Sequence, residues 1–251
     1  MKAVRKTGLF LSTVVLFSTL TVQDAFAQSR RGGGSALPTG SHSIGIAIST
    51  VNAGQDDLNG VIDDLHTDGS TLADTKDLGS AWEITANWIY RFDRTMYAFV
   101  FRPSYFTQKS EGSGTGGSYD VSLTGFTVFP IFRMYPLENS FIKFFMQGGL
   151  GYGSLKGQID AGASNLGFEG SAFGAMGGIG VDFCFTDAHC LTIEGNIRYL
   201  PIERNKVTSG NCTTLPGTSQ CTNGSELERN NKDLQTTMSG VQGLVGYTMN
   251  F

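Results

Sequence analysis

Six charged side chains lie at alternate positions within otherwise apolar segments, and they are the first candidates for chemistry. They are Glu83, Arg102, Lys143, Asp182, Glu194 and Arg198. An isolated charge is costly to remove from water, so charges on one face of an apolar strand need partners or hydration. We therefore expect these side chains to share a polar interior. There they either pair and close it, or line a pore or a solute site.

The four cysteines fall as two close pairs, Cys184 with Cys190 and Cys212 with Cys221. Four cysteines allow three connectivities, and proximity in sequence favours these two. The alternative is a zinc site at the first pair, but His189 is the one further ligand type nearby, and structural zinc needs four ligands. We therefore expect two disulfides, formed in an oxidising compartment.

Catalytic and metal-binding patterns are weak in this chain. Its three histidines are His42, His66 and His189. Only His66 has aspartate and serine neighbours in an expected outer loop, and a Ser-His-Asp site is recognised by geometry that the sequence does not supply. The aspartates between residues 56 and 77 miss the third and twelfth ligand positions of a calcium-binding loop. We expect no catalytic residues, no enzyme activity, no cofactor and no metal.

The first residues of the chain indicate export. Three basic residues precede an apolar stretch at residues 8–22, and small residues around Ala27 suit a cleavage site. This is the pattern of a secretory signal peptide, and the stretch is shorter than the ~20 residues of a membrane-spanning helix. We expect a signal peptide at residues 1–27, cleaved near Ala27, and a flexible Gly-rich leader at 28–39.

The positioning elements are eight segments in which apolar and polar residues alternate with the two-residue period of a strand. They cover residues 40–51, 78–91, 95–107, 119–135, 141–153, 171–185, 190–200 and about 233–251. In each, we take the apolar face as outward. Val121 and Leu123 are thus expected outward in the fourth strand, where Pro130 suggests a bulge beyond which facing is not assigned. Gly-rich stretches in strands five and six are expected to make room for bulky interior side chains.

The connections between these segments alternate in length. Three are tight, at residues 92–94, 136–140 and 186–189, and four are long and polar, at 52–77, 108–118, 154–170 and 201–232. Outer-membrane barrels have short periplasmic turns and long extracellular loops, and an even strand count returns both termini to the periplasm. A soluble β-sandwich also has short alternating strands, but it requires neither this asymmetry nor outward aromatics. The pattern predicts an all-β fold, an eight-stranded antiparallel up-and-down transmembrane β-barrel at residues 40–251.

The last strand ends on an aromatic residue. Counting back in twos from Phe251 gives Met249 and Tyr247 on one face, and outer-membrane barrels carry a C-terminal assembly signal of this kind. With the eight strands and the loop asymmetry, this segment resembles the OmpA-type small barrel superfamily over about residues 40–251. The resemblance implies the cell outer membrane as the location. It also implies the barrel-assembly machinery, outer-membrane lipids and lipopolysaccharide as partners.

Function is less constrained than fold. A formal net charge of -4 offers no basic surface for nucleic acid. Eight strands leave an interior just wide enough for side chains, so we favour a closed, ion-paired lumen. We expect a monomer with a structural, envelope-integrity or surface-interaction role through its extracellular loops. The alternative is a porin-like narrow channel for small solutes or hydrophobic molecules, and a lipid-modifying envelope enzyme is third.

Overall fold

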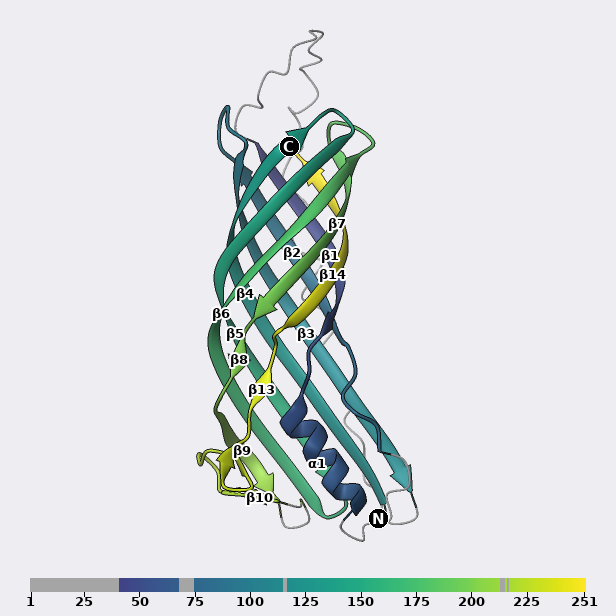
Figure 1. Cartoon of the computed structure of the whole chain (residues 1–251), viewed down its shortest axis with the longest axis vertical. Coiled ribbons are helices and arrows are strands. Elements are labelled where there is room, and N and C mark those ends of the chain that lie inside the picture. Colours follow the sequence, from purple (N-terminus) through teal and green to yellow (C-terminus); the bar gives the residue numbers. More distant parts are fainter. Residues whose placement is uncertain (1–40, 68–74, 115–116, 213–214, 216) are drawn as a thin grey trace, which may run out of the picture. The chain divides into compact units, whose positions relative to one another are not determined.

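Eight long strands dominate the part of the chain that the structure describes (Figure 1). The computed structural model describes residues 41–67, 75–114, 117–212, 215 and 217–251, so the expected signal peptide and leader lie outside the described residues. The long strands are β1 (His42–Asn52), β2 (Ala81–Arg91), β3 (Tyr97–Gly114), β4 (Gly117–Glu138), β5 (Ile142–Ala161), β6 (Ser164–Cys184), β7 (His189–Tyr199) and β14 (Gly240–Asn250).

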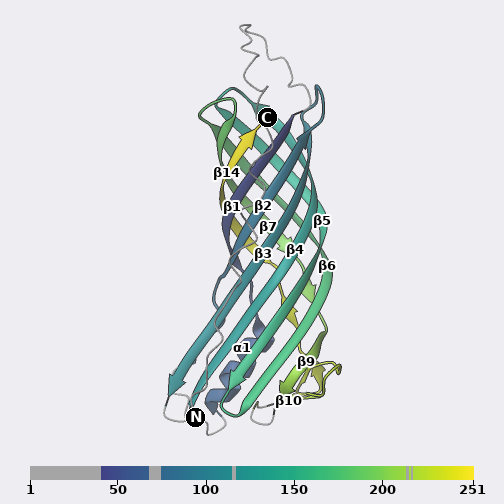
Figure 2. The ribbon, with the colours of Figure 1, turned by 180° about the vertical axis from the view of Figure 1, so that it is seen from behind.

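These eight strands close into a ring. The pairing order is β1-β2-β3-β4-β5-β6-β7-β14, and β14 pairs back onto β1. Every pairing in the ring is antiparallel, so the eight-stranded up-and-down barrel predicted from the sequence is confirmed (Figure 2). Of the described residues, none belongs to a helix long and apolar enough to cross a membrane.

The two ends of the barrel differ. Three short turns, at residues 92–96, 139–141 and 185–188, join β2 to β3, β4 to β5 and β6 to β7 at the end where the C-terminus lies (Figure 1). We call this the turn end and the opposite end the head end. The predicted tight turns are therefore confirmed, with boundaries shifted by one to three residues.

Strand length divides the barrel into two halves. β1, β2, β7 and β14 have 11 residues each, close to the ~9–11 residues that cross a membrane. β3, β4, β5 and β6 have 18, 22, 20 and 21 residues and continue past the short strands at the head end. The predicted loops at 108–118 and 154–170 are therefore wrong, because most of their residues extend the β3–β4 and β5–β6 ladders.

The apolar face of the long strands changes sides along their length. In β4, Val121 and Leu123 are buried inside, on the same face as Thr127 and Arg133 further along the strand. The prediction that Val121 and Leu123 face outward is wrong, because near the head end the outer surface is polar and the inner one apolar. Pro130 faces outward without a bulge, and the register of β4 with β5 shifts instead between Met134 and Leu137.

One helix fills the head end where β1 and β2 stop. Helix α1 (Asp56–Thr67) begins with two acidic residues in its first turn, which suit the positive end of the helix dipole. Leu58, Val61, Ile62 and Leu65 repeat with helical spacing and are all buried. They belong to one apolar core with Phe106, Tyr119, Leu123, Leu155, Ile159, Leu166 and Phe168 of the long strands. The predicted loop at 52–77 thus contains a helix.

The last connection carries six short strands. They are β8 (Pro201–Ile202), β9 (Asn205–Asn211), β10 (Thr218–Ser219), β11 (Glu228–Arg229), β12 (Lys232–Asp233) and β13 (Thr236–Thr237). β9 extends the barrel sheet by pairing with β6, and β8 pairs with β13. The terminal strand β14 begins at Gly240, later than the predicted start near Asp233. We call α1, these short strands and the head-end parts of β3 to β6 the head.

Candidate functional site

Glu194 of β7 joins two arginines inside the barrel. Its Oε2 lies 2.8 Å from Arg102 Nη2 on β3, and its Oε1 lies 2.7 Å from Arg133 Nη2 on β4. All three side chains are at most 2% exposed. Gln147 Nε2 donates to Glu194 Oε2 at 2.9 Å, and Arg102 Nε donates to Asn87 Oδ1 at 2.6 Å. The carboxylate is thus shared by two guanidinium groups, each held by a further hydrogen bond, while Arg102 Nη1 is buried without a partner among the described residues.

A second ion pair crosses the barrel toward the head end. Arg198 Nη1 on β7 lies 2.9 Å from Glu83 Oε1 on β2, and Gln242 Nε2 of β14 donates to Glu83 Oε2 at 3.0 Å. Asn196 Nδ2 donates to both Gln242 Oε1 and Glu194 Oε2 at 3.2 Å. The two ion-paired groups therefore form one continuous polar network across the lumen.

The other two predicted lumen charges lie closer to the turn end. Asp182 is buried and accepts a 2.6 Å hydrogen bond from Thr192 Oγ1. Lys143 is partly exposed, and its Nζ lies 3.6 Å from Glu138 Oε1. Glu138 also accepts a 2.6 Å hydrogen bond from Arg91 Nη1. The structure therefore brings Glu83, Arg102, Glu194 and Arg198 into one network, while Lys143 belongs to a cluster at the turn-end mouth.

Sequence reasoning missed Arg133, the second partner of Glu194. Arg133 follows Pro130, where an expected bulge left the facing of the strand unassigned. The alternation in fact runs unbroken from Val121 through Arg133 and Tyr135. Counting in twos across the proline would have placed Arg133 in the lumen. Its guanidinium also lies 3.8 Å from the ring centroid of Phe145, a cation–π contact.

Aromatic side chains occupy the space that inward glycines leave. A Cβ atom built on Gly151 would lie 2.3 Å from the ring of Phe129, and one on Gly180 would lie 2.3 Å from the ring of Phe145. Both rings are buried. Of the Gly-rich stretches expected to make room for bulky interior side chains, Gly151 in strand five does so, whereas Gly149 and Gly174 lie against the backbone of the neighbouring strand. Together with the ion pairs, these rings fill the interior, as the narrow bore of eight strands allows.

Two glutamines connect the barrel to the head where the regular ladder ends. Gln55, just before α1, donates to Thr237 O at 2.6 Å and accepts from Thr237 N at 3.1 Å. Its side-chain amide thus makes the two hydrogen bonds that the backbone of a neighbouring strand would make. It also donates to Gln108 Oε1 at 3.0 Å. Gln108 donates in turn to the carbonyl oxygens of Ala53 and Gly79. These buried amides satisfy backbone groups that have lost their neighbouring strand.

The cysteine pairs lie in the two places expected for them. Cys184 and Cys190 are bonded across β6 and β7 next to a turn at the turn end, and Cys212 and Cys221 are bonded within the head. No free cysteine occurs among the described residues.

The expected assembly residues lie at the turn end. Tyr247 and Phe251 are exposed, Met249 is half-buried, and Phe251 N donates to His42 O at 2.8 Å. The ring of His189 stacks on Tyr247 at the same end. His66 lies in the last turn of α1, in the head. The three histidines are thus divided between the two ends of the barrel.

Comparisons with known proteins support the fold. No protein-family model matches this chain, and no curated protein sequence matches it. Among solved structures, the outer membrane protein OprG from Pseudomonas aeruginosa is similar with a TM-score of 0.55 at 12% identity, over 86% of this chain and 98% of OprG. A major outer membrane protein from Thermus thermophilus gives 0.47 at 10% identity, over 84% and 99%. Neisserial surface protein A gives 0.44 at 13% identity, over 85% and 100%.

At these identities the comparison concerns fold, and it rests on OprG, whose TM-score exceeds 0.5. The similarity to OprG agrees with the closed ring of eight antiparallel strands seen in this chain. The apolar outer face and the polar lumen also support an outer-membrane barrel fold. The chain therefore has the fold of the small outer-membrane β-barrel proteins.

Proposed function

We propose that this chain is a closed barrel of the cell outer membrane, with a structural or surface-interaction role carried by its head. In this proposal a signal peptide is cleaved near Ala27, the turn end faces the periplasm and the head faces outward. The predicted export signal and the gathering of short turns at one end support this orientation.

The observation that carries the proposal is the filled lumen. Arg102, Arg133 and Glu194 meet across the barrel at hydrogen-bond distance, and each is almost inaccessible to water. A water-filled pore would leave such charges exposed to the solvent that it conducts. Closing the lumen with ion pairs and rings favours a stable wall with an outward head over a path for solutes.

The head supports a surface role because it is built as a packed body. Four strands extend into it, and α1 packs four apolar side chains against them. The β11–β12 turn is attached to α1 by Arg229, whose Nη2 lies 2.6 Å from Asp64 Oδ2. A body with its own apolar core holds its outer surface in a defined shape, as recognition by a partner requires.

Two of the three histidines lie away from the outer leaflet on which a lipid-modifying enzyme would act, and the third, His66, lies in the head. His42 and His189 lie at the turn end, which in this orientation is far from the outer leaflet. His42 stacks on Trp88, and His189 stacks on Tyr247. Both rings thus pack on aromatic residues of the barrel wall.

Conductance in a planar bilayer tests the closed lumen. Purified protein, refolded and shown to be folded by its faster migration on an unheated gel, should insert without steady current. Stable ohmic steps would refute the closed lumen and favour a channel for small solutes or hydrophobic molecules. The gel control matters because an unfolded sample is also silent.

A further inference from the structure

A ring of aromatic side chains marks one membrane boundary on the outer surface. Six consecutive strands of the barrel, β2 to β7, each end their lipid-facing apolar run with one aromatic residue. These residues are Trp82, Tyr105, Phe126, Tyr152, Phe173 and Tyr199. From strand to strand, the next aromatic residue is either directly opposite the one before it, or shifted from that opposite position by two residues toward the turn end. Shifts of this kind keep a ring level when the strands are tilted. Aromatic belts of this kind lie at the membrane–water interface.

Directly above this ring the outer surface becomes polar in two steps. Two residues further along β3, β4, β5 and β6, every outward side chain carries a hydroxyl: Thr107, Thr124, Ser154 and Ser171. Four residues beyond the aromatic ring, the outward side chains are Lys109, Ser122, Lys156 and Glu169. Four residues of a tilted strand rise about 10 Å. A lysine at that height reaches down to the headgroup layer with its own side chain.

Two lysines on the β5–β6–β9 flank are poorly paired. Lys156, Glu169 and Lys206 lie opposite one another on adjacent strands, which puts the lysine backbones about 10 Å apart. Lys156 is 73% exposed, and its Nζ lies 3.9 Å from Glu169 Oε2, at the limit of an ion pair. Within the described part of the chain, Lys206 has no ion pair, although it lies between Glu169 and Glu226, each directly opposite it on a neighbouring segment. By contrast, Lys109 at the same height lies 2.8 Å from Glu111 and 3.0 Å from Asp120.

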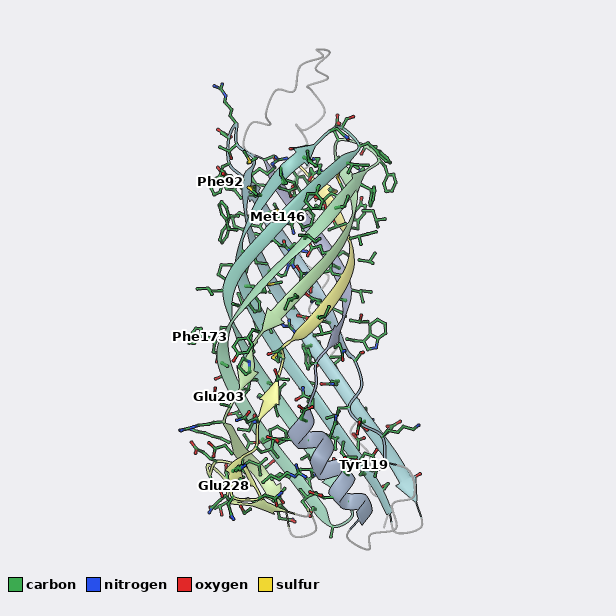
Figure 3. All side chains as sticks on the ribbon, viewed as in Figure 1. Phe92, Tyr119, Met146, Phe173, Glu203 and Glu228 are labelled. Atoms are coloured by element: carbon green, nitrogen blue, oxygen red, sulfur yellow. A yellow bond between two sulfur atoms is a disulfide. The ribbon has the colours of Figure 1, made fainter. Side chains whose placement is uncertain are left out.

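The same flank carries the most exposed apolar ring of the surface, Phe173, at 83% exposure. Figure 3 shows Phe173 and Glu203 projecting from this side of the barrel. Arg204 is also exposed here, but its guanidinium is paired with Glu226 and Asp233. An apolar anchor, a hydroxyl and two lysines thus follow one another from the lipid outward.

We propose that this flank binds the phosphorylated sugar headgroup of an outer-leaflet glycolipid. Lys156 and Lys206 bind its phosphate, Ser154 and Ser171 hydrogen-bond to its sugar, and Phe173 packs against its acyl chains. Lysine is a common phosphate ligand in proteins. The inference rests on the proposed orientation, in which the head end faces outward. Glu169 between the lysines weakens the site and provides an internal test.

The test measures binding of bisphosphorylated lipid A to folded protein in detergent by native mass spectrometry. The variant Lys156→Gln/Lys206→Gln should bind about tenfold more weakly than the wild type, because it loses two charge-assisted contacts. Lys109→Gln removes a lysine at the same height whose charge is already neutralised, and it should bind as the wild type does. Glu169→Gln should bind more tightly, because the lysines lose a competing carboxylate.

Dephosphorylated lipid A should bind no better to the wild type than to the double variant. Equal binding of bisphosphorylated lipid A by the wild type and the double variant would overturn the proposal. So would displacement of the lipid by millimolar inorganic phosphate, which would indicate a site for free anions. Orientation is tested separately by cleavage of the head with protease added to whole cells. A failure there refutes the proposed function without altering the binding result.

Discussion

Replacing Glu194 with Gln should destabilise the barrel more than any other single change among its lumen charges. Glu194 pairs with Arg102 at 2.8 Å and with Arg133 at 2.7 Å, and no other carboxylate lies within ion-pair distance of either arginine in the described residues. Glutamine keeps the shape but leaves two buried guanidinium groups without a counter-charge. Breaking a buried ion pair by removing one partner costs about 3–5 kcal/mol. We expect a loss in that range, roughly a thousandfold in the folding equilibrium constant.

The structure also predicts the order of related variants. Arg102→Gln leaves Glu194 paired with Arg133, so it should cost only a charge-assisted hydrogen bond, about 1.5–3 kcal/mol. Arg198→Ala removes the sole cation paired with Glu83 among the described residues, leaving that carboxylate with hydrogen bonds from neutral groups. It should therefore cost more than Arg102→Gln.

Urea unfolding in lipid vesicles, under conditions where folding is reversible, measures these losses. Trp82 and Trp88 face outward, so their fluorescence reports transfer of the strands between lipid and water. Gel migration without heating gives an independent measure of the folded fraction. The reasoning is refuted if Glu194→Gln costs less than about 1 kcal/mol, or if Arg102→Gln costs as much as Glu194→Gln.

Three further predictions concern assembly and the head. Deleting Phe251 should lower insertion into the outer membrane while export continues; unchanged amounts of heat-modifiable folded protein would contradict this. Reducing the Cys212–Cys221 bond should leave the barrel folded but make the head more sensitive to protease, since a short loop contributes only ~2 kcal/mol; peptide mapping that found other pairs would refute it. A Cβ at Gly60 would lie 2.2 Å from Arg229 Nη1, so Gly60→Ala should displace Arg229 and speed trypsin cleavage of the β11–β12 turn; an unchanged rate would show that the contact is dispensable.

The barrel strands were predictable because lipid and lumen impose opposite demands on alternate residues. In β7, Ile193 and Ile197 face outward while Glu194 and Arg198 face inward, as predicted. The two-residue period fixes facing without knowledge of the partner strand. Glu83 of β2 and Arg102 of β3, which the same period places on the inward face, are buried.

Pairing across the lumen was less accessible to sequence. Glu83 and Arg198 are 115 residues apart and lie on strands that are not neighbours in the ring. Their contact depends on the bore of the closed barrel and on the relative height of each strand. Knowing which side chains face inward gives neither the bore of the barrel nor the relative heights of the strands. Predicting that Glu194 pairs with both Arg102 and Arg133 would also have required knowing that β4 residues beyond Pro130 keep the same inward and outward faces.

The helix was missed although its signal was present. Leu58, Val61, Ile62 and Leu65 have the spacing of one helix face, and acidic residues open the segment. A long polar connection is the ordinary expectation at that position in an outer-membrane barrel. The helix forms because the extended strands β3 to β6 offer it an apolar surface, and a sequence read strand by strand does not show that surface.

The reversal of polarity along β4 links the fold to the membrane. Toward the turn end, outward Phe126 and Phe132 meet lipid while inward Thr127 and Arg133 meet the polar lumen. Toward the head end, outward residues are polar, and inward Leu123 joins the core that includes α1. A strand that kept one apolar face throughout would expose it to water in the head or bury it against charges in the lumen. The change of faces occurs at the aromatic ring on the outer surface. Inside the barrel, buried apolar residues such as Phe129 and Ile131 continue past the ring toward the turn end, so the outward side chains alone mark the membrane boundary used for the lipid site.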